Sequence, residues 1–285
     1  MDVAILGCGY VGLELGARLT AAGHEVVGVR RSDAGVRAIS DAGFDAVQGD
    51  VTDSDDLTTV PGVDAVVYAA SAGGRDVSAA RDVYVDGLET TVETFTARDD
   101  PPERFVYTSS TGVYGDRDGA WVDEETPLEP TTDRQAALVE AERIALEATG
   151  PMDGTVARFA GLYGPDRYRL ERYLDGPVAE GYLNLVHRDD AAGAVQFLLE
   201  EDRARDDVVL VVDDEPVERQ VLARWLADQC GVEPPDVRPP EAASGRARSS
   251  KRCSNDRLRD LGYEFAYPTF REGYRSAVEE WTENV

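Results

Sequence analysis

The sequence predicts an α/β fold, a Rossmann-type doubly wound parallel sheet with a small C-terminal substrate lobe. Three observations carry this prediction. Apolar segments with strand character alternate with helical segments along the first half of the chain. The first strand runs directly into glycines at G-x-G-x-x-G spacing. The last third of the 285 residues is less regular and contains a Pro/Ser-rich loop at 233–250.

The expected elements follow one another in the order of a doubly wound sheet. Segments such as "DVAIL" are apolar enough for buried parallel strands. The expected strands are 2–6, 25–29, 44–50, 64–70, 104–110 and 154–160, followed by 182–187 and 207–214. The expected helices are one ending at Ala22, then 32–43, 54–60, 78–98, a helix starting at Thr132, 188–200 and 217–230.

We expect residues 1–165 to form a nucleotide-binding Rossmann domain and residues 166–285 a smaller substrate-binding lobe, interleaved with the sheet around 182–212. A chain of this length has room for both. Ligands of open α/β sheets bind at the carboxyl ends of the strands, so the lobe is expected over that edge.

Charge is the strongest compositional signal. Asp and Glu number 56 against 29 Lys and Arg, a net charge of −27, and Lys251 is the only lysine. The acids are spread along the chain, which favours a halophilic protein whose self-repulsion is screened by a salty cytoplasm. An acidic surface for a basic partner is the other interpretation. Nucleic-acid binding is disfavoured in both cases, because phosphates would be repelled.

Several absences set the expected compartment. No run of about 18 apolar residues predicts a membrane span, and the N-terminus lacks the basic segment of a signal peptide. Cys8, Cys230 and Cys253 are scattered, without the spacing of a disulfide framework or a metal motif. We therefore expect a cytoplasmic protein without a metal site.

The strongest local motif is "GCGYVG", in which Gly7, Gly9 and Gly12 surround Tyr10 and Val11. Glycines between a strand and a helix let the backbone approach a pyrophosphate at the helix N-terminus. The motif predicts a dinucleotide site. A glycine-rich turn without a nucleotide is the structural alternative.

The second strand ends in "GVRRS", where an NAD site usually carries an acidic residue. Arg30, Arg31 and Ser32 stand there instead. Two guanidinium groups suit the 2′-phosphate of NADP, so we expect NADP to be preferred over NAD. Two solvated surface arginines are the alternative.

Two further strand ends complete the expected cofactor site. Asp50 ends the third strand, and Ala69, Ala70 and Ser71 end the fourth. The adenine and nicotinamide halves of the cofactor would pass these strand ends.

These segments together resemble the short-chain dehydrogenase/reductase superfamily, in its extended, NAD-dependent epimerase/dehydratase branch. The segments "YTSSTGVYG" (107–115), "ARFAGLYGP" (157–165) and "NLVHRDDAAGAVQFLL" (184–199) are similar to motifs of that branch, and the resemblance runs from Val3 to about Val278. It implies an NAD(P)-dependent oxidoreductase or epimerase-like enzyme acting on a small polar or sugar-derived substrate.

The family's catalytic Tyr-x-x-x-Lys pair is missing. Alignment on Pro130 and Glu142 puts Arg134 at the tyrosine position and Leu138 at the lysine position. Arginine stays protonated and leucine has no polar group, so neither replaces its counterpart. The chain therefore resembles atypical members that keep the nucleotide loop without the pair.

Three residues are candidates for the remaining chemistry. By resemblance, Ser110 would hydrogen-bond a substrate oxygen. Tyr114 is the first substitute for the missing tyrosine, with a packed loop tyrosine as the alternative. Arg134 could neutralise an anionic substrate or a developing oxyanion, or form a salt bridge to Asp133 or Glu124.

Four more residues have both a functional and a structural interpretation. By resemblance Tyr163 lines the cleft or has a structural role, and His187 is a hydrogen-bonded family residue rather than a base. Lys251 and Arg252 either close over an anionic substrate or pack the lobe.

Alternatives to an enzyme are a catalytically silent NADP-binding sensor and an acidic interaction protein. Arg143, Glu140 and Glu147 lie on the outward face of the helix that starts at Thr132, so we expect a monomer or a weak homodimer.

Overall fold

The structure is a computed structural model that describes residues 1–72, 80–147, 149–239 and 249–283. The chain divides into two compact units, each built from separate segments. Unit 1 comprises Met1–Val113, Leu128–Arg158 and Ala192–Val209, and unit 2 comprises Tyr114–Pro127, Phe159–Ala191 and Leu210–Val285. Among the described residues, no helix combines the length and the apolar character that crossing a bilayer requires.

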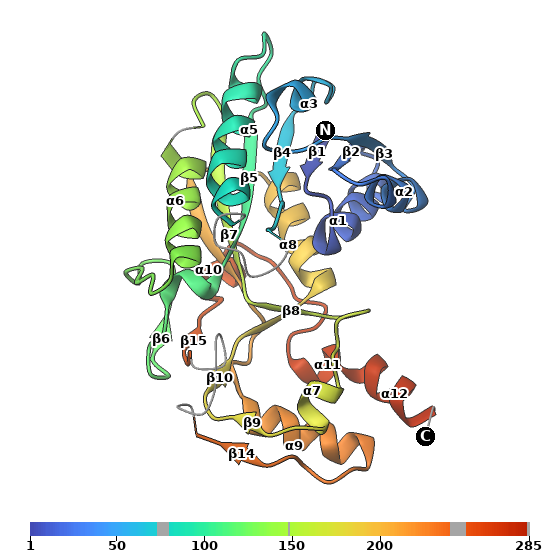
Figure 1. Cartoon of the computed structure of the whole chain (residues 1–285), viewed down its shortest axis with the longest axis vertical. Coiled ribbons are helices and arrows are strands. Elements are labelled where there is room, and N and C mark those ends of the chain that lie inside the picture. The colour runs from blue at the N-terminus through green and yellow to red at the C-terminus, as the bar shows by residue number, and fades with distance from the viewer. Residues whose placement is uncertain (73–79, 148, 240–248, 284–285) are drawn as a thin grey trace. The chain divides into compact units, whose positions relative to one another are not determined.

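A seven-stranded sheet in the order β12-β7-β5-β4-β1-β2-β3 forms the centre of unit 1 (Figure 1). The strands are β1 (Asp2–Leu6), β2 (Glu25–Arg30), β3 (Asp45–Gln48), β4 (Ala65–Tyr68), β5 (Arg104–Ser110), β7 (Asp153–Phe159) and β12 (Asp207–Val211). Strands β3, β2, β1, β4 and β5 pair in parallel. The chain runs outward from β1 to β3 and then returns to β4 on the other side of β1, so the predicted doubly wound Rossmann-type fold is confirmed.

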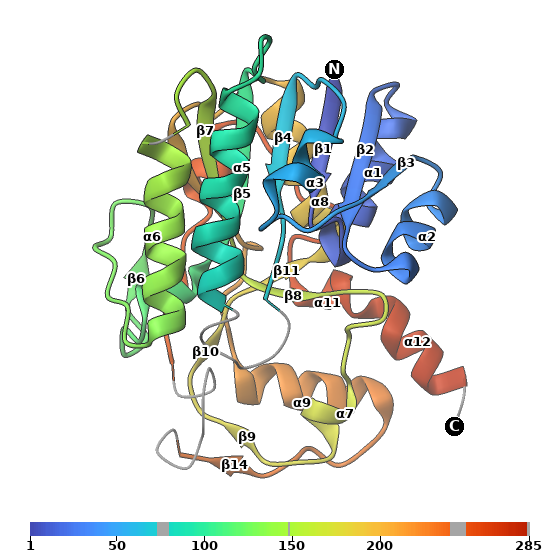
Figure 2. The same ribbon diagram turned by 45° about the horizontal axis from the view of Figure 1, so that its top comes forward.

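Helices flank this sheet, as expected for a doubly wound fold. They are α1 (Tyr10–Ala21), α2 (Asp33–Asp41), α3 (Ser54–Thr58), the π-helical turn η1 (Asp82–Asp86), α5 (Gly87–Thr96), the 3₁₀ turn η2 (Thr111–Tyr114), α6 (Asp133–Glu147) and most of α8 (Arg188–Glu200). Figures 1 and 2 show α5 and α6 side by side along one face of the sheet. His24 Nε2, after α1, lies within hydrogen-bond distance, 2.9 Å, of Glu200 Oε1 at the end of α8.

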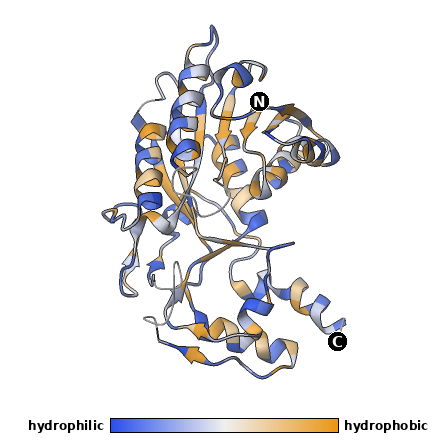
Figure 3. Ribbon diagram, in the orientation of Figure 1, coloured by the Kyte–Doolittle hydropathy of each residue, from blue (hydrophilic) through white to orange (hydrophobic). Residues whose placement is uncertain are grey.

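The colouring by hydropathy in Figure 3 shows hydrophobic residues concentrated on the strands of unit 1. Strand β4 is buried over its whole length, and β1 is buried from Val3 to Leu6. This continuous burial explains why their sequences are apolar without alternation, since both faces of the sheet are covered.

Helix α6 begins as its sequence predicts. The Gln135 N–H donates to Thr132 Oγ1 at 3.3 Å, and the Thr132 N–H donates to Gln135 Oε1 at 3.1 Å, which completes a capping box. Leu138 and Ala141 on the inner face are buried. The start of α6 is therefore held by its own side chains before any tertiary contact is counted.

Unit 2 consists of short elements around a core of its own. Its strands pair as β6 (Trp121–Val122) with β15 (Arg252–Cys253), β8 (Gly161–Tyr163) with β11 (Leu185–His187), β9 (Val178–Ala179) with β14 (Val237–Arg238), and β10 (Tyr182–Leu183) with β13 (Val217–Glu218). Its helices are α7 (Glu171–Leu174), α9 (Arg219–Cys230), α10 (Asp256–Asp260), α11 (Phe270–Gly273) and α12 (Arg275–Glu283). Leu222, Leu226, Phe270 and Tyr274 are central in the core.

Two predicted elements of unit 2 differ from the structure. The predicted strand 182–187 is interrupted at Asn184, whose side chain bonds the main chain at Lys251 and Cys253 instead of continuing a ladder. The predicted helix 217–230 starts two residues late, because Val217 and Glu218 pair with β10. Residues 78–79 of the predicted helix 78–98, and 240–248 of the predicted loop 233–250, lie outside the described residues.

Candidate nucleotide and catalytic site

The turn between β1 and α1 can only be made with glycine at its first position. Gly7 has φ +72°, and a Cβ there would lie 2.2 Å from Ala70 Cα. The N–H groups of Gly7 and Cys8 both donate to Val29 O at 3.1 Å. The turn is thus packed against the segment after β4 and bonded to the end of β2, at the carboxyl edge of the sheet.

The next glycines shape the start of α1. Gly9 is the N-cap residue, and no side chain caps the start of α1. The first turn of α1 contains no acidic residue. A Cβ on Gly12 would lie 3.0 Å from Ile5 Cγ2, so the glycine lets the helix approach β1 closely. The positive end of the helix dipole therefore lies at this turn, without a carboxylate of the first turn to oppose a phosphate.

Arg30 is part of the glycine turn rather than a solvated side chain. Its Nη1 donates to Cys8 O at 3.1 Å, and a Cβ on Gly9 would lie 2.8 Å from the same nitrogen. A Cβ on Gly35 would lie 2.8 Å from Arg30 Cβ, so glycine at the start of α2 makes room for the arginine. Two glycines thus hold one guanidinium group between the turn and α2.

Arg31 and Ser32 have different surroundings. Arg31 is exposed and pairs with Asp50, Nη1 to Oδ2, at 3.3 Å. Ser32 caps α2, since its Oγ accepts the Gly35 N–H at 3.1 Å. Burial alone would raise the pKa of Asp50, but hydrogen bonds from Thr52 and the Arg31 guanidinium outweigh it and lower the pKa. Asp50 is therefore an ionised partner of Arg31.

The remaining predicted cofactor residues line the same edge. The Ala69 N–H donates to Leu6 O at 2.8 Å, Ala70 lies under the glycine turn, and Ser71 is exposed. Burial raises the pKa of the neighbouring Cys8 thiol to about 12, so that side chain is a neutral packing group.

Ser110 ends β5, next to β4 in the parallel ladder. Its Oγ accepts the Gly112 N–H at 3.1 Å. Gln135 Nε2 donates to Gly112 O at 2.9 Å, so the capping residue of α6 also fixes the loop after Ser110.

Arg134, in the first turn of α6, contacts a tyrosine that sequence analysis did not select. Its Nη2 donates to Tyr84 Oη at 2.5 Å and to Ala72 O at 3.4 Å. The guanidinium carbon lies 5.1 Å from the centre of the Tyr84 ring. Leu138, which the sequence alignment put at the position of the family lysine, is buried in the core. No sequence signal links Tyr84 to Arg134, which is 50 residues away.

Tyr114 is fully buried, and its hydroxyl donates to Asp123 O at 2.6 Å. These contacts are those of the packed loop tyrosine that sequence analysis gave as the alternative. Its proton is already donated to the main chain, which makes it a poor source of a proton for a substrate.

A buried ion pair lies behind the start of α6. Arg158 Nη2 and Glu142 Oε2 are 2.8 Å apart, Arg158 Nε donates to Glu142 Oε1 at 3.0 Å, and Ser109 Oγ donates to Glu142 Oε1 at 2.5 Å. Both charged side chains are about 5% exposed or less. Because every partner is hydrogen-bonded, the network can fix α6 against β5 and β7.

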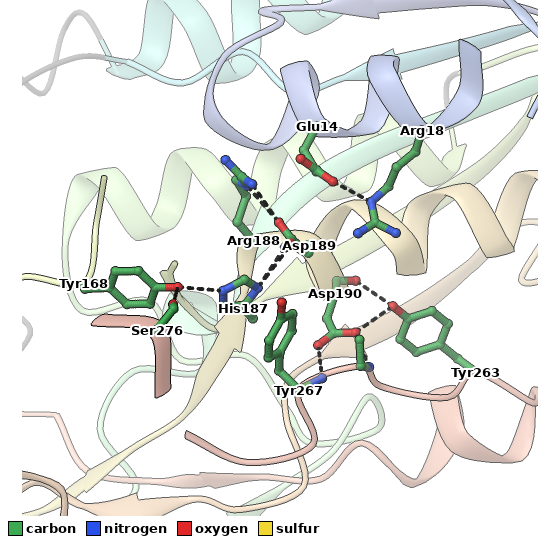
Figure 4. Close-up of polar contacts among 11 residues, drawn as sticks. Glu14, Arg18, Tyr168, His187, Arg188, Asp189, Asp190, Tyr263, Tyr267 and Ser276 are labelled. Atoms are coloured by element: carbon green, nitrogen blue, oxygen red, sulfur yellow. Dashed lines mark hydrogen bonds and ion pairs between the residues drawn. The ribbon is translucent and has the colours of Figure 1, made fainter. Parts of the chain in front are cut away.

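His187 in unit 2 is packed among tyrosines (Figure 4). Its ring centre is 3.8 Å from that of Tyr267 and 5.3 Å from that of Tyr163, and its Nδ1 accepts the Asp189 N–H at 3.3 Å. The Tyr163 ring stacks on Tyr274 with centres 4.8 Å apart. These contacts are those of a hydrogen-bonded structural histidine.

Figure 4 also draws Asp190, which links α8 to the segment 263–267, and an ion pair within α1. Asp190 accepts the N–H groups of Ala266 and Tyr267 at 2.8 Å and the Tyr263 hydroxyl at 3.1 Å. A separate pair within α1, Glu14 with Arg18, spans 2.7 Å.

Lys251 and Arg252 contact other residues of unit 2. Lys251 is buried, and its Nζ donates to Gly115 O at 3.0 Å. Arg252 Nε donates to Gly119 O at 2.8 Å, and its guanidinium lies 5.1 Å from the ring centres of Trp121 and Tyr182. These contacts agree with packing of the lobe.

Unit 2 also contains a pocket of about 720 Å³. None of the predicted site residues lines it. Six carboxyl-bearing residues do, namely Asp123, Glu124, Glu125, Asp214, Asp256 and Asp260. Such walls repel phosphate, so this pocket is poorly suited to a nucleotide.

Comparison with known proteins gives consistent matches. The model of the NAD dependent epimerase/dehydratase family matches residues 3–211. Protein YeeZ of Escherichia coli (strain K12) is 32% identical over 274 residues, which are 93% of this chain and 96% of that protein.

Two further matches agree with this. A dTDP-glucose 4,6-dehydratase of Streptomyces niveus is 31% identical over 206 residues, 65% of this chain and 61% of that protein. A solved structure of a putative NAD-dependent epimerase/dehydratase from Methylobacillus flagellatus has a TM-score of 0.80 and 31% identity, over 99% of this chain and 98% of that one.

Proposed function

The chain belongs to the NAD-dependent epimerase/dehydratase family, and from this premise we propose that it is an NADP-preferring oxidoreductase or epimerase-like enzyme. The proposed substrate is a small polar or sugar-derived molecule, a class to which the substrate named for the Streptomyces niveus relative belongs. The cofactor would supply or accept the hydride.

The glycine turn carries the nucleotide part of this proposal. A Cβ on Gly7 would overlap Ala70, so only glycine lets the main chain of the turn lie this close to the segment after β4. The N-terminus of α1 follows directly, with Gly9 as its N-cap residue. Backbone N–H groups in the first turn of α1 would hold the pyrophosphate, which agrees with a nicotinamide dinucleotide as the ligand.

The NADP preference rests on three residues after β2. Arg30 is held at the turn by Cys8 O, Arg31 lies beside it in the chain, and Ser32 caps α2. Two guanidinium groups at the N-terminus of a nine-residue helix favour the doubly charged 2′-phosphate. Asp50 would compete for Arg31, so Arg30 is the stronger candidate.

Fluorescence titration with NADPH and NADH in molar salt tests both parts. We expect NADPH to bind more tightly, and Arg30→Ala to weaken NADPH binding about 10-fold or more with little effect on NADH. Arg37→Ala is the matched control, because Arg37 is an exposed arginine further along α2. Equal affinities for the two cofactors would contradict the preference, and binding of neither would contradict the nucleotide site.

The positions of the family pair favour a second candidate, a catalytically silent NADP-binding sensor. Arg134 and Leu138 stand there, and the Tyr114 hydroxyl is already bonded to Asp123 O. NADPH turnover with a panel of carbonyl compounds separates the two. Turnover that is lost in Ser110→Ala supports the enzyme, whereas tight binding without turnover by any compound supports the sensor.

Cytoplasmic location, adaptation to high salt and a monomeric or weakly dimeric state are further parts of the proposal. The net charge of −27 supports the salt dependence. Light scattering at low and high salt measures both the oligomeric state and the effect of screening.

A further inference from the structure

We propose that Tyr84 transfers the proton in this site and that Arg134 positions it. A tyrosine from η1 and an arginine from α6 then do together what Tyr-x-x-x-Lys does within one helix. The inference rests on the proposed function, because it needs a bound nicotinamide and a substrate.

The contact between the two side chains is specific. Arg134 Nη2 donates to Tyr84 Oη at 2.5 Å, and the guanidinium carbon lies 5.1 Å from the ring centre. The tyrosine oxygen is the acceptor in this bond, so its own proton remains to be donated to another group. A guanidinium group stays charged and can stabilise negative charge on the oxygen after that proton has left.

The backbone that carries Tyr84 is itself unusual. Asp82–Asp86 form a π-helical turn directly before α5. The Tyr68 hydroxyl donates to Val83 O in this turn, and a Cβ on Gly87 would lie 2.7 Å from that hydroxyl. Strand β4 thus fixes the turn through one buried side chain. Single π-helical turns of this kind occur frequently at functional sites.

The pair lies at the edge where chemistry is expected. Arg134 Nη2 also approaches Ala72 O at 3.4 Å, four residues beyond the end of β4. Ser110 ends the adjacent parallel strand β5, and Gln135, next to Arg134, is bonded to the loop after Ser110. The first turn of α6 is therefore bonded to the segment after β4 through Arg134 and to the loop after β5 through Gln135.

Two of the three other tyrosines of unit 1, Tyr68 and Tyr107, are less suited to proton transfer. Tyr68 and Tyr107 have no exposed surface, whereas Tyr84 keeps 7%. Burial raises the pKa of both Tyr68 and Tyr107, so each holds its proton. Tyr68 also donates that proton to Val83 O.

The proposed step balances as follows for reduction of a carbonyl. A bound reduced nicotinamide would supply the hydride for the new C–H bond at the substrate carbon and would be left oxidised. The substrate oxygen takes the C=O electron pair and the proton of Tyr84 Oη, so the phenolic O–H bond breaks and an alcohol O–H bond forms. The phenolate remains beside the Arg134 guanidinium until water returns a proton. Oxidation of an alcohol is the reverse.

Chemical labelling tests the pair without a known substrate. An aryl sulfonyl fluoride reacts with tyrosine oxygens whose negative charge a nearby cation stabilises, and mass spectrometry locates the adduct among the 12 tyrosines. We expect Tyr84 to be labelled and bound NADPH to protect it. Arg134→Met should slow labelling about 10-fold or more, and Arg134→Lys should restore part of the rate by keeping the charge.

Tyr274→Phe is the matched control, because it removes a buried hydroxyl in unit 2, to which neither Tyr84 nor Arg134 belongs. It should leave the Tyr84 adduct unchanged. With any carbonyl compound that is turned over, Tyr84→Phe should lower turnover about 100-fold or more while NADPH still binds. Thermal unfolding of each variant shows whether the fold is kept.

The outcomes separate this inference from the proposed function. If NADPH binds but Tyr84 is neither labelled nor protected, or if Arg134→Met labels as fast as the wild type, Tyr84 is not the proton donor and the nucleotide site stands. If NADPH does not bind to the wild type, the proposed function itself fails.

Discussion

The glycine turn after β1 and the first turn of α6 lie in the same unit and differ in how they keep the family pattern. At the glycine turn the pattern is intact, and a Cβ at Gly7 would overlap Ala70. At α6 the helix, its capping box and its buried face are present, while our alignment puts Arg134 and Leu138 at the positions of the catalytic pair. A binding site made of main-chain atoms tolerates few substitutions, whereas the task of one side chain can be carried out by another side chain nearby.

The physical reason is that few arrangements can bind a pyrophosphate, whereas many can donate a proton. Backbone N–H groups reach a pyrophosphate only if no side chain intervenes, which requires glycine. A proton can come from any hydroxyl that a second group orients. The Tyr84–Arg134 contact is one such arrangement, built from two elements instead of one.

The largest effect is expected at the buried ion pair of Glu142 and Arg158, which we expect to fix α6 in place. Glu142→Gln leaves the Arg158 charge uncompensated in the core and should lower the free energy of unfolding by about 3–5 kcal/mol. Glu140→Gln on the exposed face, opposite Arg81 at 2.6 Å, should lose far less. Urea unfolding measures both. If Glu142→Gln lowers the free energy of unfolding as little as Glu140→Gln does, the buried network is dispensable.

Gly7→Ala should have the next largest effect, because it places a Cβ 2.2 Å from Ala70 Cα at φ +72°. We expect a loss of about 2–4 kcal/mol in the free energy of unfolding together with loss of NADPH binding. Gly23→Ala is the matched control, since Gly23 has φ +90° and nothing within 4 Å of the added Cβ. It should cost about 1–2 kcal/mol and leave binding intact. Equal effects of the two changes would mean that close packing at the turn is unimportant.

The smallest effect is a pH dependence at Asp50. Its pKa is lowered below 3.8 in the folded protein, so the stabilisation is present above pH 3.8 and is lost as the pH falls through the lowered pKa. The difference in stability between wild type and Asp50→Asn should be under about 1 kcal/mol at neutral pH, because the pair with Arg31 is largely exposed. Unfolding at decreasing pH should show the difference fading. A difference that stays constant with pH would assign it to packing.

Much of unit 1 could be predicted from the sequence because its signals are local. The apolar strands, the glycine spacing, the "GVRRS" end of β2 and the capping box of α6 each lie within a few residues. In unit 2 the short strands depend on partners far away in the chain, and Asn184 interrupts a segment that reads as one strand. The shorter an element is, the more its partner decides its limits.

The sequence by itself determined the doubly wound fold and the family resemblance, since these follow from periodicity and from residue types at short spacing. Tertiary structure decided that the Tyr114 hydroxyl donates to Asp123 O, that Arg31 pairs with Asp50, and that Arg134 donates to Tyr84. These contacts join residues up to 50 positions apart. Only the packing of strands and helices brings such side chains together, because no local preference encodes which of many arginines and tyrosines will meet.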